Sequence, residues 1–271
     1  MLKPSPFLQG DEEVFDSITD GALKRRVKNH LIAREHDFFA VVQPGFERVT
    51  SAEFSGMGLS VKDIYIEGGV EFTGKPGSCY TASLLSRTAG RIMMRVAEFR
   101  SSGYFELERS IRSFPWQLYI SPGTEIIFSA SAAKSMIYHT GKLEEIFNAG
   151  IKERLVSKGI ENRNNETSCS QTVFLRNNRD VCTVSLDASG ESLYKRGRGK
   201  NISRAPLRET TAALILLEAG IGRYGLVIDP MCGSGTFSLE AASIFTETPP
   251  NCEREFTFMH WPCFRMSTFG F

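Results

Sequence analysis

The segment Leu226-Val227-Ile228-Asp229-Pro230-Met231-Cys232-Gly233-Ser234-Gly235-Thr236-Phe237 decides the fold expected for this chain. Its first three residues predict a short strand, its glycines a tight turn, and the alanine-rich continuation to Ile244 a helix. In open α/β folds this succession leads to the carboxyl edge of a parallel sheet, where ligands bind. Free N–H groups at the helix start form a positively biased cradle, and Asp229 can accept a hydrogen bond from a ligand.

Three interpretations of the glycine turn compete. A phosphate-binding loop of the GxxxxGK[ST] type needs a lysine, but Gly235 is followed directly by Thr236. A dinucleotide fingerprint of the GxGxxG type needs a third glycine, where this sequence has Ser238. A plain strand, turn and helix without a ligand is the third interpretation. Spacing alone does not separate that interpretation from a binding site.

The residues before this segment show the sharpest change of composition in the chain. Between Leu193 and Arg208 there is no acidic residue. A helix is expected to begin at Pro206, because proline suits a first helical turn, and to end at Gly220. Such a basic stretch is typical of contacts with nucleic-acid phosphates, and a solvated interdomain linker is the alternative. Its cations are Lys195, Arg196, Arg198, Lys200, Arg204 and Arg208.

The front half alternates between strand and helix patterns. It follows a polar extension over 1–36 that contains a possible basic helix over Gly21–Arg34. Hairpins expected around Gly68-Gly69 and Asn177-Asn178 favour an α+β domain of the split-βαβ type. Strands are expected at 38–42, 64–66, 70–72, 91–99, 124–130, 171–175 and 181–186, and helices at 46–57, 80–89, 104–114 and 140–156.

Composition limits the class of protein. The chain has 271 residues, 41% of them hydrophobic and 23% charged, with a net charge of +1, which suits one or two globular domains. No apolar run reaches the length of about 18 residues that a transmembrane helix needs. The six cysteines form no CxxC pair, which argues against a zinc site and against a disulfide framework and favours reduced thiols in a cytoplasm.

Five segments resemble one enzyme family. Asp229–Thr236, followed by Glu240-Ala241-Ala242, resembles motif I of the THUMP-domain RNA guanine-N2 methyltransferases, in the bacterial type that acts on large-subunit ribosomal RNA. The other four resemble the family's S-LYHTG, D-SG--L-KRG-R, APLKE--AA and F-F--WP-F patterns, and they are Ser135–Gly141, Asp187–Arg198, Ala205–Ala213 and Phe256–Phe264.

The resemblance implies an α+β fold with a particular domain plan. After the extension 1–36, residues 37–190 would form a ferredoxin-like and THUMP RNA-binding region. A basic linker over 191–204 would lead to residues 205–271, the start of an incomplete Rossmann-like methyltransferase domain. The implied partner is structured RNA, ribosomal RNA in particular, with no membrane and no metal.

The resemblance also implies S-adenosylmethionine as the cofactor. The residues implied to bind it are Asp229, Pro230, Cys232, Gly233, Ser234, Gly235, Thr236, Pro206 and Glu209. The residues implied to contact RNA are Lys195, Arg196, Arg198, Lys200 and His139.

The sequence lacks the (N/D)PP(Y/F) motif with which the family orients the target amine. No residue of this chain is therefore expected to be catalytic. Nothing after Ile244 predicts the next parallel strand, whose acidic end would hold a ribose. We expect either the N-terminal portion of a methyltransferase, inactive alone, or a non-catalytic RNA-binding module.

Overall fold

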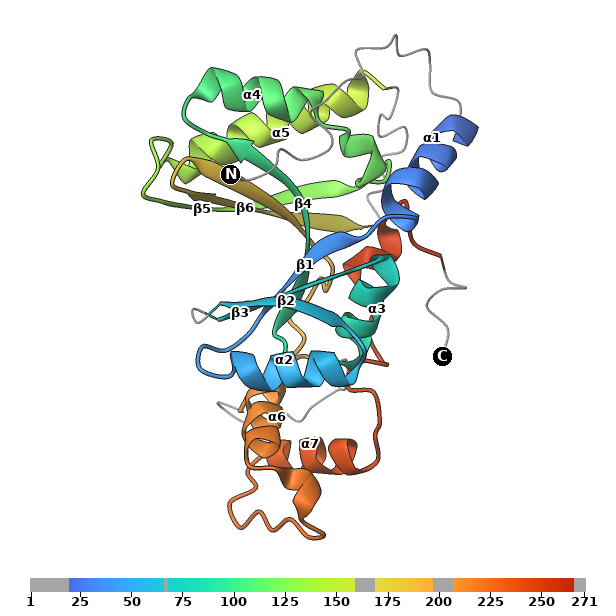
Figure 1. Ribbon diagram of the computed structural model, residues 1–271, viewed down its shortest axis with the longest axis vertical. Helices are drawn as coiled ribbons and strands as arrows, with labels where there is room; N and C mark the ends of the chain where they lie inside the picture. The colour runs from blue at the N-terminus through green and yellow to red at the C-terminus, as the bar shows by residue number, and fades with distance from the viewer. Residues whose placement is uncertain (1–19, 66–67, 159–168, 197–206, 266–271) are drawn as a thin grey trace. The chain divides into compact units, whose positions relative to one another are not determined.

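The computed structural model describes residues 20–65, 68–158, 169–196 and 207–265. The chain forms two compact units (Figure 1). Unit 1 comprises Met1–Arg34, Arg95–Asp187 and Met259–Phe264, and unit 2 comprises Glu35–Met94, Ala188–Phe258 and Arg265–Phe271. Residues 37–190, which were expected to form a single region, are therefore divided between the two units. The division falls after Met94, within the long strand β4 (Arg91–Arg100).

Unit 2 contains the expected split-βαβ domain. Its elements are β1 (His36–Val41), α2 (Glu47–Gly56), β2 (Ser60–Tyr65), β3 (Gly69–Gly74), α3 (Pro76–Leu85) and the start of β4. The strands pair antiparallel in the order β2-β3-β1-β4, which is the ferredoxin-like arrangement. Helix α3 begins at Pro76 rather than at Tyr80, because proline is suited to the first helical position.

Aromatic side chains fill the core between the helices and this sheet. The ring of Phe38 stacks on Phe72 with centroids 5.2 Å apart, and Phe54 of α2 meets Phe72 edge-on at 5.1 Å. All three are fully buried. Phe258 stacks on Tyr80 of α3 at 4.5 Å, and Phe256 and Phe258 are both buried, so these two phenylalanines after the glycine turn belong to the core.

Unit 1 is built from the rest of β4, α4 (Tyr104–Ser113), η2 (Trp116–Leu118), β5 (Glu125–Ala133), α5 (Thr140–Val156), β6 (Ser170–Asn178) and β7 (Val181–Asp187). Its strand order is β4-β7-β6-β5, and α4 and α5 lie over one face of this sheet (Figure 1). Strands β5 and β6 run parallel, and α5 supplies the crossover that a parallel pair requires. Before these elements come α1 (Asp20–Val27) and the π-helical η1 (Lys28–Ile32).

The turn between β6 and β7 corrects one expectation. The turn residues are Arg179 and Asp180, with φ of 50° and 58°, and not Asn177-Asn178. Asn177 cannot lie in a solvated turn, because its side chain is buried and donates to the backbone oxygen of Ile137 at 2.8 Å.

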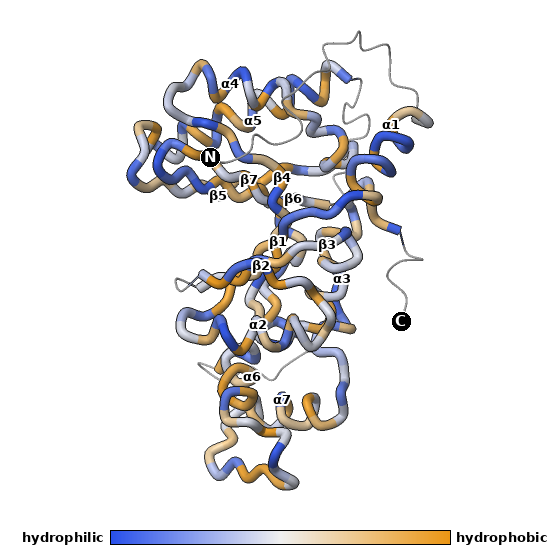
Figure 2. Tube along the Cα trace, in the orientation of Figure 1, coloured by the Kyte–Doolittle hydropathy of each residue, from blue (hydrophilic) through white to orange (hydrophobic). Residues whose placement is uncertain are grey.

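The C-terminal part of unit 2 contains α6 (Glu209–Glu218), η3 (Ile221–Arg223), α7 (Thr236–Phe245) and η4 (Thr257–His260), whose last two residues fall in unit 1. The strand expected over Leu226–Ile228 was wrong: the segment pairs with no strand of the described chain. Leu226 is 74% exposed and Ile228 is 77% exposed. A strand needs a neighbour to satisfy its backbone, and the described residues supply none here. Figure 2 shows how apolar the α6 and α7 region is.

Candidate functional site

The glycine turn before α7 has the backbone shape that the sequence predicted. Gly233 and Gly235 adopt φ of +52° and +75°, a region that glycine enters without steric penalty. The Gly235 N–H donates to the Cys232 oxygen at 2.7 Å, and Gly235 is the N-cap of α7. The hydroxyls of Ser234 and Thr236 lie 3.0 Å apart within the turn.

This turn fits a small polar ligand. The Oδ1 atom of Asp229 accepts the Met231 N–H at 3.3 Å, whereas its Oδ2 atom is buried without a hydrogen-bond partner. Buried polar atoms are normally paired, so an orphaned carboxylate oxygen points to a missing donor. A Cβ built on Gly235 would meet no atom within 4 Å, and one on Gly233 only the Met231 oxygen at 4.0 Å. The backbone is therefore open to close approach.

The structure describes only some of the other residues that were expected around the cofactor. Pro230 and Cys232 are exposed on the same turn. Glu209 is the first residue of α6 and is 9% exposed. Pro206 lies outside the described residues, as do Arg198 and Lys200 of the basic stretch.

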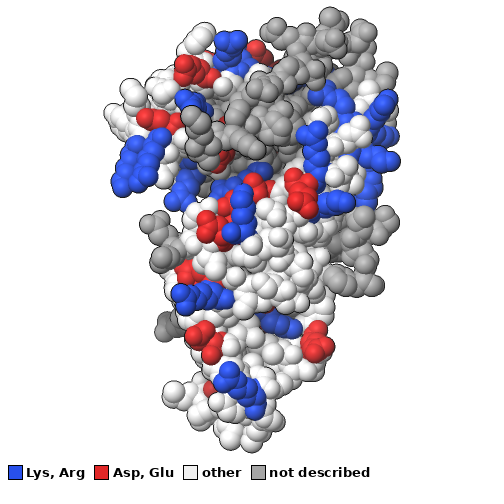
Figure 3. Space-filling view, in the orientation of Figure 1, with Lys and Arg blue, Asp and Glu red and all other residues white. Residues whose placement is uncertain are grey.

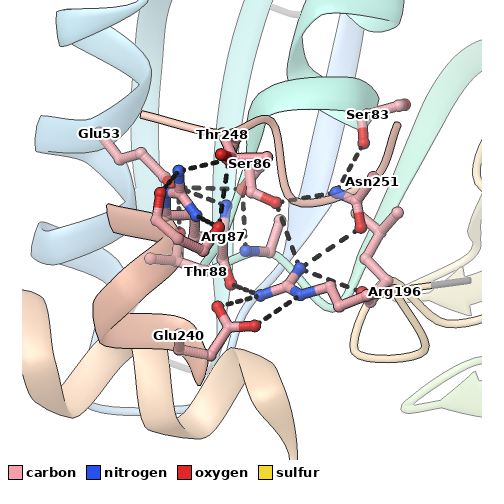
Figure 4. Close-up of polar contacts among 12 residues, drawn as sticks. Glu53, Ser83, Ser86, Arg87, Thr88, Arg196, Glu240, Thr248 and Asn251 are labelled. Carbon is pink, nitrogen blue, oxygen red and sulfur yellow. Dashed lines mark hydrogen bonds and ion pairs between the residues drawn. The ribbon is translucent and has the colours of Figure 1, made fainter. Parts of the chain in front are cut away.

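Arg196 corrects the predicted RNA contact at its position. Its side chain is 3% exposed and pairs with Glu240 of α7, with Nη2 3.2 Å from Oε2 (Figure 4). The same guanidinium donates to the backbone oxygens of Arg87 at 2.7 Å and Leu193 at 3.1 Å. A guanidinium held in this way is not available to phosphates. Lys195, its neighbour, is exposed and pairs with Glu191 at 2.9 Å.

The Arg196 network includes residues that no sequence pattern singled out. Asn251 donates to the backbone oxygens of Ser83 and Ser86 at 3.0 Å each, and Arg87 donates to the backbone oxygen of Thr248 at 2.7 Å (Figure 4). Arg87 also donates to the Ser243 hydroxyl at 2.7 Å, so the network fastens α7, which begins at the glycine turn, to the 86–88 segment that follows α3. Glu240 and Arg196 each lay in a recognised motif, but their pairing had no signal in the sequence.

Glu53 of α2 supports the same segment. Its carboxylate accepts hydrogen bonds from the Arg87 N–H at 2.8 Å and the Ser86 hydroxyl at 2.9 Å, and also from the Thr88 hydroxyl. Burial raises the pKa of the Glu53 carboxyl, and these hydrogen bonds partly oppose that rise.

A basic surface lies on unit 1. Lys and Arg side chains gather over α1 in Figure 3, where Lys24 and Arg25 are exposed. Burial lowers the pKa of Arg154 in the same unit, and the cation of Arg26 lowers it further. His139, predicted to contact RNA, is exposed as the N-cap of α5.

The described residues contain neither a cluster of metal ligands nor a membrane-spanning helix. Among them, no group of three or more His, Cys, Asp or Glu side chains could hold a metal ion. No described helix has both the length and the apolar character needed to cross a bilayer.

Two known domain families match the chain. Residues 37–93 match the RlmL ferredoxin-like domain, and residues 196–267 match the RMKL-like methyltransferase domain. A ribosomal RNA large subunit methyltransferase K/L of Methylococcus capsulatus is 32% identical over 237 residues. That match covers 83% of this chain, but only 31% of the relative's length.

Solved structures share the fold. A predicted N6-adenine-specific DNA methylase from Listeria monocytogenes superposes with a TM-score of 0.76 at 26% identity, covering 87% of this chain and 62% of that one. SMU.472, a methyltransferase candidate solved as a complex with SAH, superposes with a TM-score of 0.73 at 26% identity and the same coverages. These findings confirm the α+β fold class and the family resemblance drawn from the five segments.

Proposed function

We propose that this chain, which joins an RlmL-type ferredoxin-like domain to the start of an RMKL-like methyltransferase domain, is the RNA-binding and cofactor-turn portion of an S-adenosylmethionine-dependent methyltransferase. The proposed substrate is large-subunit ribosomal RNA, modified at a guanine N2, and the proposed location is the cytoplasm. The chain spans about a third of the curated relative's length, so the rest of the enzyme's sheet and its target-base motif would come from beyond these residues.

One observation carries the proposal. The orphaned Oδ2 atom of Asp229 lies beside the open glycine turn, where it can accept a hydrogen bond from a cationic or hydroxyl-bearing part of the cofactor. The N–H groups at the start of α7 would face the same ligand. Pro230, Cys232, Ser234 and Thr236 would line the turn, with Pro206 and Glu209 beside it. When bound, the cofactor supplies an electrophilic methyl group.

RNA would be held by cations outside the cofactor turn. Lys195, Arg198 and Lys200 of the basic stretch, with His139 of unit 1, are the proposed contacts, and the exposed cations of α1 add to them. Arg196 is omitted, because its guanidinium is buried against Glu240. Phosphate contacts of this kind are electrostatic and weaken with salt.

A non-catalytic RNA-binding module is the second candidate. The observation that favours it is the exposed Leu226–Ile228 segment, which has no strand beside it in the described chain. In that case the front half would bind RNA while the glycine turn did no chemistry.

Protection of a cysteine thiol from alkylation distinguishes the methyltransferase portion from the non-catalytic RNA-binding module. Cys232 lies in the glycine turn and Cys252 does not, and both are exposed. We expect millimolar S-adenosylhomocysteine to slow alkylation of Cys232, measured by mass spectrometry, and to leave Cys252 unchanged as the internal control. Asp229→Asn should remove the protection. Unprotected Cys232 in a chain that still binds RNA would favour the binding module.

A further inference from the structure

The loop between β5 and α5, residues 134–139 of unit 1, is held rigidly. The Met136 N–H donates to Asp180 Oδ1 at 2.7 Å, and the Asp180 N–H donates to the Ser135 hydroxyl at 3.1 Å. Ile137 is 2% exposed, and its backbone oxygen accepts from the buried Asn177 side chain at 2.8 Å. The loop is therefore anchored at both its backbone and its central side chain.

This anchored loop presents its large side chains to solvent. Met136 is 70% exposed and Tyr138 is 65% exposed. The rings of Tyr138 and His139 are in contact with each other, with centroids 4.1 Å apart and planes tilted by 39°. Exposed large side chains are ordinary when scattered singly, but Met136, Tyr138 and His139 on one fixed loop form a preformed contact surface.

Two cations flank the same loop. Lys134 is its first residue, and Arg179 is tied to its start, since the Arg179 N–H donates to the Ala133 oxygen at 3.3 Å. Both side chains are exposed, and neither has an ion-pair partner among the described residues. Exposed rings beside unpaired cations match the two parts of a nucleotide, a flat base and a phosphate.

We infer that the 134–139 loop is a stacking site for an unpaired base of structured RNA, with Tyr138 and His139 against the base and Lys134 and Arg179 at the flanking phosphates. The inference rests on the proposed function and adds a site for single-stranded RNA to it. A base within a duplex is stacked on its neighbours and cannot offer its face to these rings. The loop should therefore distinguish RNA with unpaired bases from fully paired RNA.

The test compares two RNAs of equal length and charge, a hairpin with an unpaired loop and a blunt duplex, by fluorescence anisotropy with the full chain. Tyr138→Ala should weaken hairpin binding by about 5-fold or more, the usual effect of losing one stacking ring, and leave duplex binding unchanged. Tyr138→Phe should bind as the unchanged chain does. Phe105→Ala is the matched control, because Phe105 of α4 is 79% exposed in the same unit.

Salt dependence gives an independent readout. Tyr138→Ala should leave the slope of log K against log salt unchanged, whereas Lys134→Gln and Arg179→Gln should each reduce it by about one. Equal loss of hairpin and duplex binding, or no loss with Tyr138→Ala, would overturn the stacking site alone. If the unchanged chain bound neither RNA, the RNA-binding part of the proposed function would fail as well.

Discussion

Replacing Arg196 by methionine tests whether this arginine is a structural residue. The change removes the guanidinium but keeps an apolar side chain, and it leaves the Glu240 carboxylate, 6% exposed, without its ion pair. The backbone oxygens of Arg87 and Leu193 also lose a donor. Breaking a buried ion pair from one side costs about 3–5 kcal/mol of unfolding free energy. That loss is a large part of the total stability of about 5–15 kcal/mol that is typical of a protein.

Urea unfolding followed by circular dichroism measures this loss. The double variant Arg196→Met with Glu240→Leu should recover much of it, because no charge then remains buried and unpaired. Lys195→Met is the matched control: it removes the neighbouring, exposed cation and should leave the unfolding midpoint unchanged. A loss below about 1 kcal/mol for Arg196→Met, or a double variant no more stable than the single one, would refute the structural role.

The remaining predictions concern RNA, the cofactor domain and pH. Neutralising Lys195, Arg198 and Lys200 together should lower the slope of log K against log salt for binding of structured RNA, because the number of released counterions sets that slope. An unchanged slope would show that the basic stretch is only a linker. The chain alone should transfer no methyl group from labelled S-adenosylmethionine to RNA, and limited proteolysis should cut first within the exposed Leu226–Met231 segment; cuts that begin in the front half would contradict this. Burial raises the pKa of Glu53 above its ordinary 4.5, so the folded state holds that proton more tightly and stability should fall as pH rises through 4.5 towards the raised pKa. Glu53→Gln should flatten that part of the stability curve, measured by thermal unfolding across pH.

The sequence by itself determined the local elements and the turn chemistry. Helix α5 has the predicted bounds, Thr140–Val156, and α2, Glu47–Gly56, lies within the helix expected at 46–57. The turn at 233–235 also has the backbone shape that its glycines predicted. These features depend on neighbours within a few residues, so their signals are complete in the sequence.

Tertiary structure decided which of these residues are free to act. Arg196 and Lys195 are adjacent cations in one basic stretch, yet one is buried against α7 and the other is solvent-exposed. Tyr138 lies in a motif that gave no sign of its exposure, which depends on the turn at Asp180 holding the loop. The apolar run Leu226–Ile228 predicted a strand, but a strand exists only where another strand satisfies its backbone. Burial and pairing join residues far apart in the chain, and a local pattern does not contain that information.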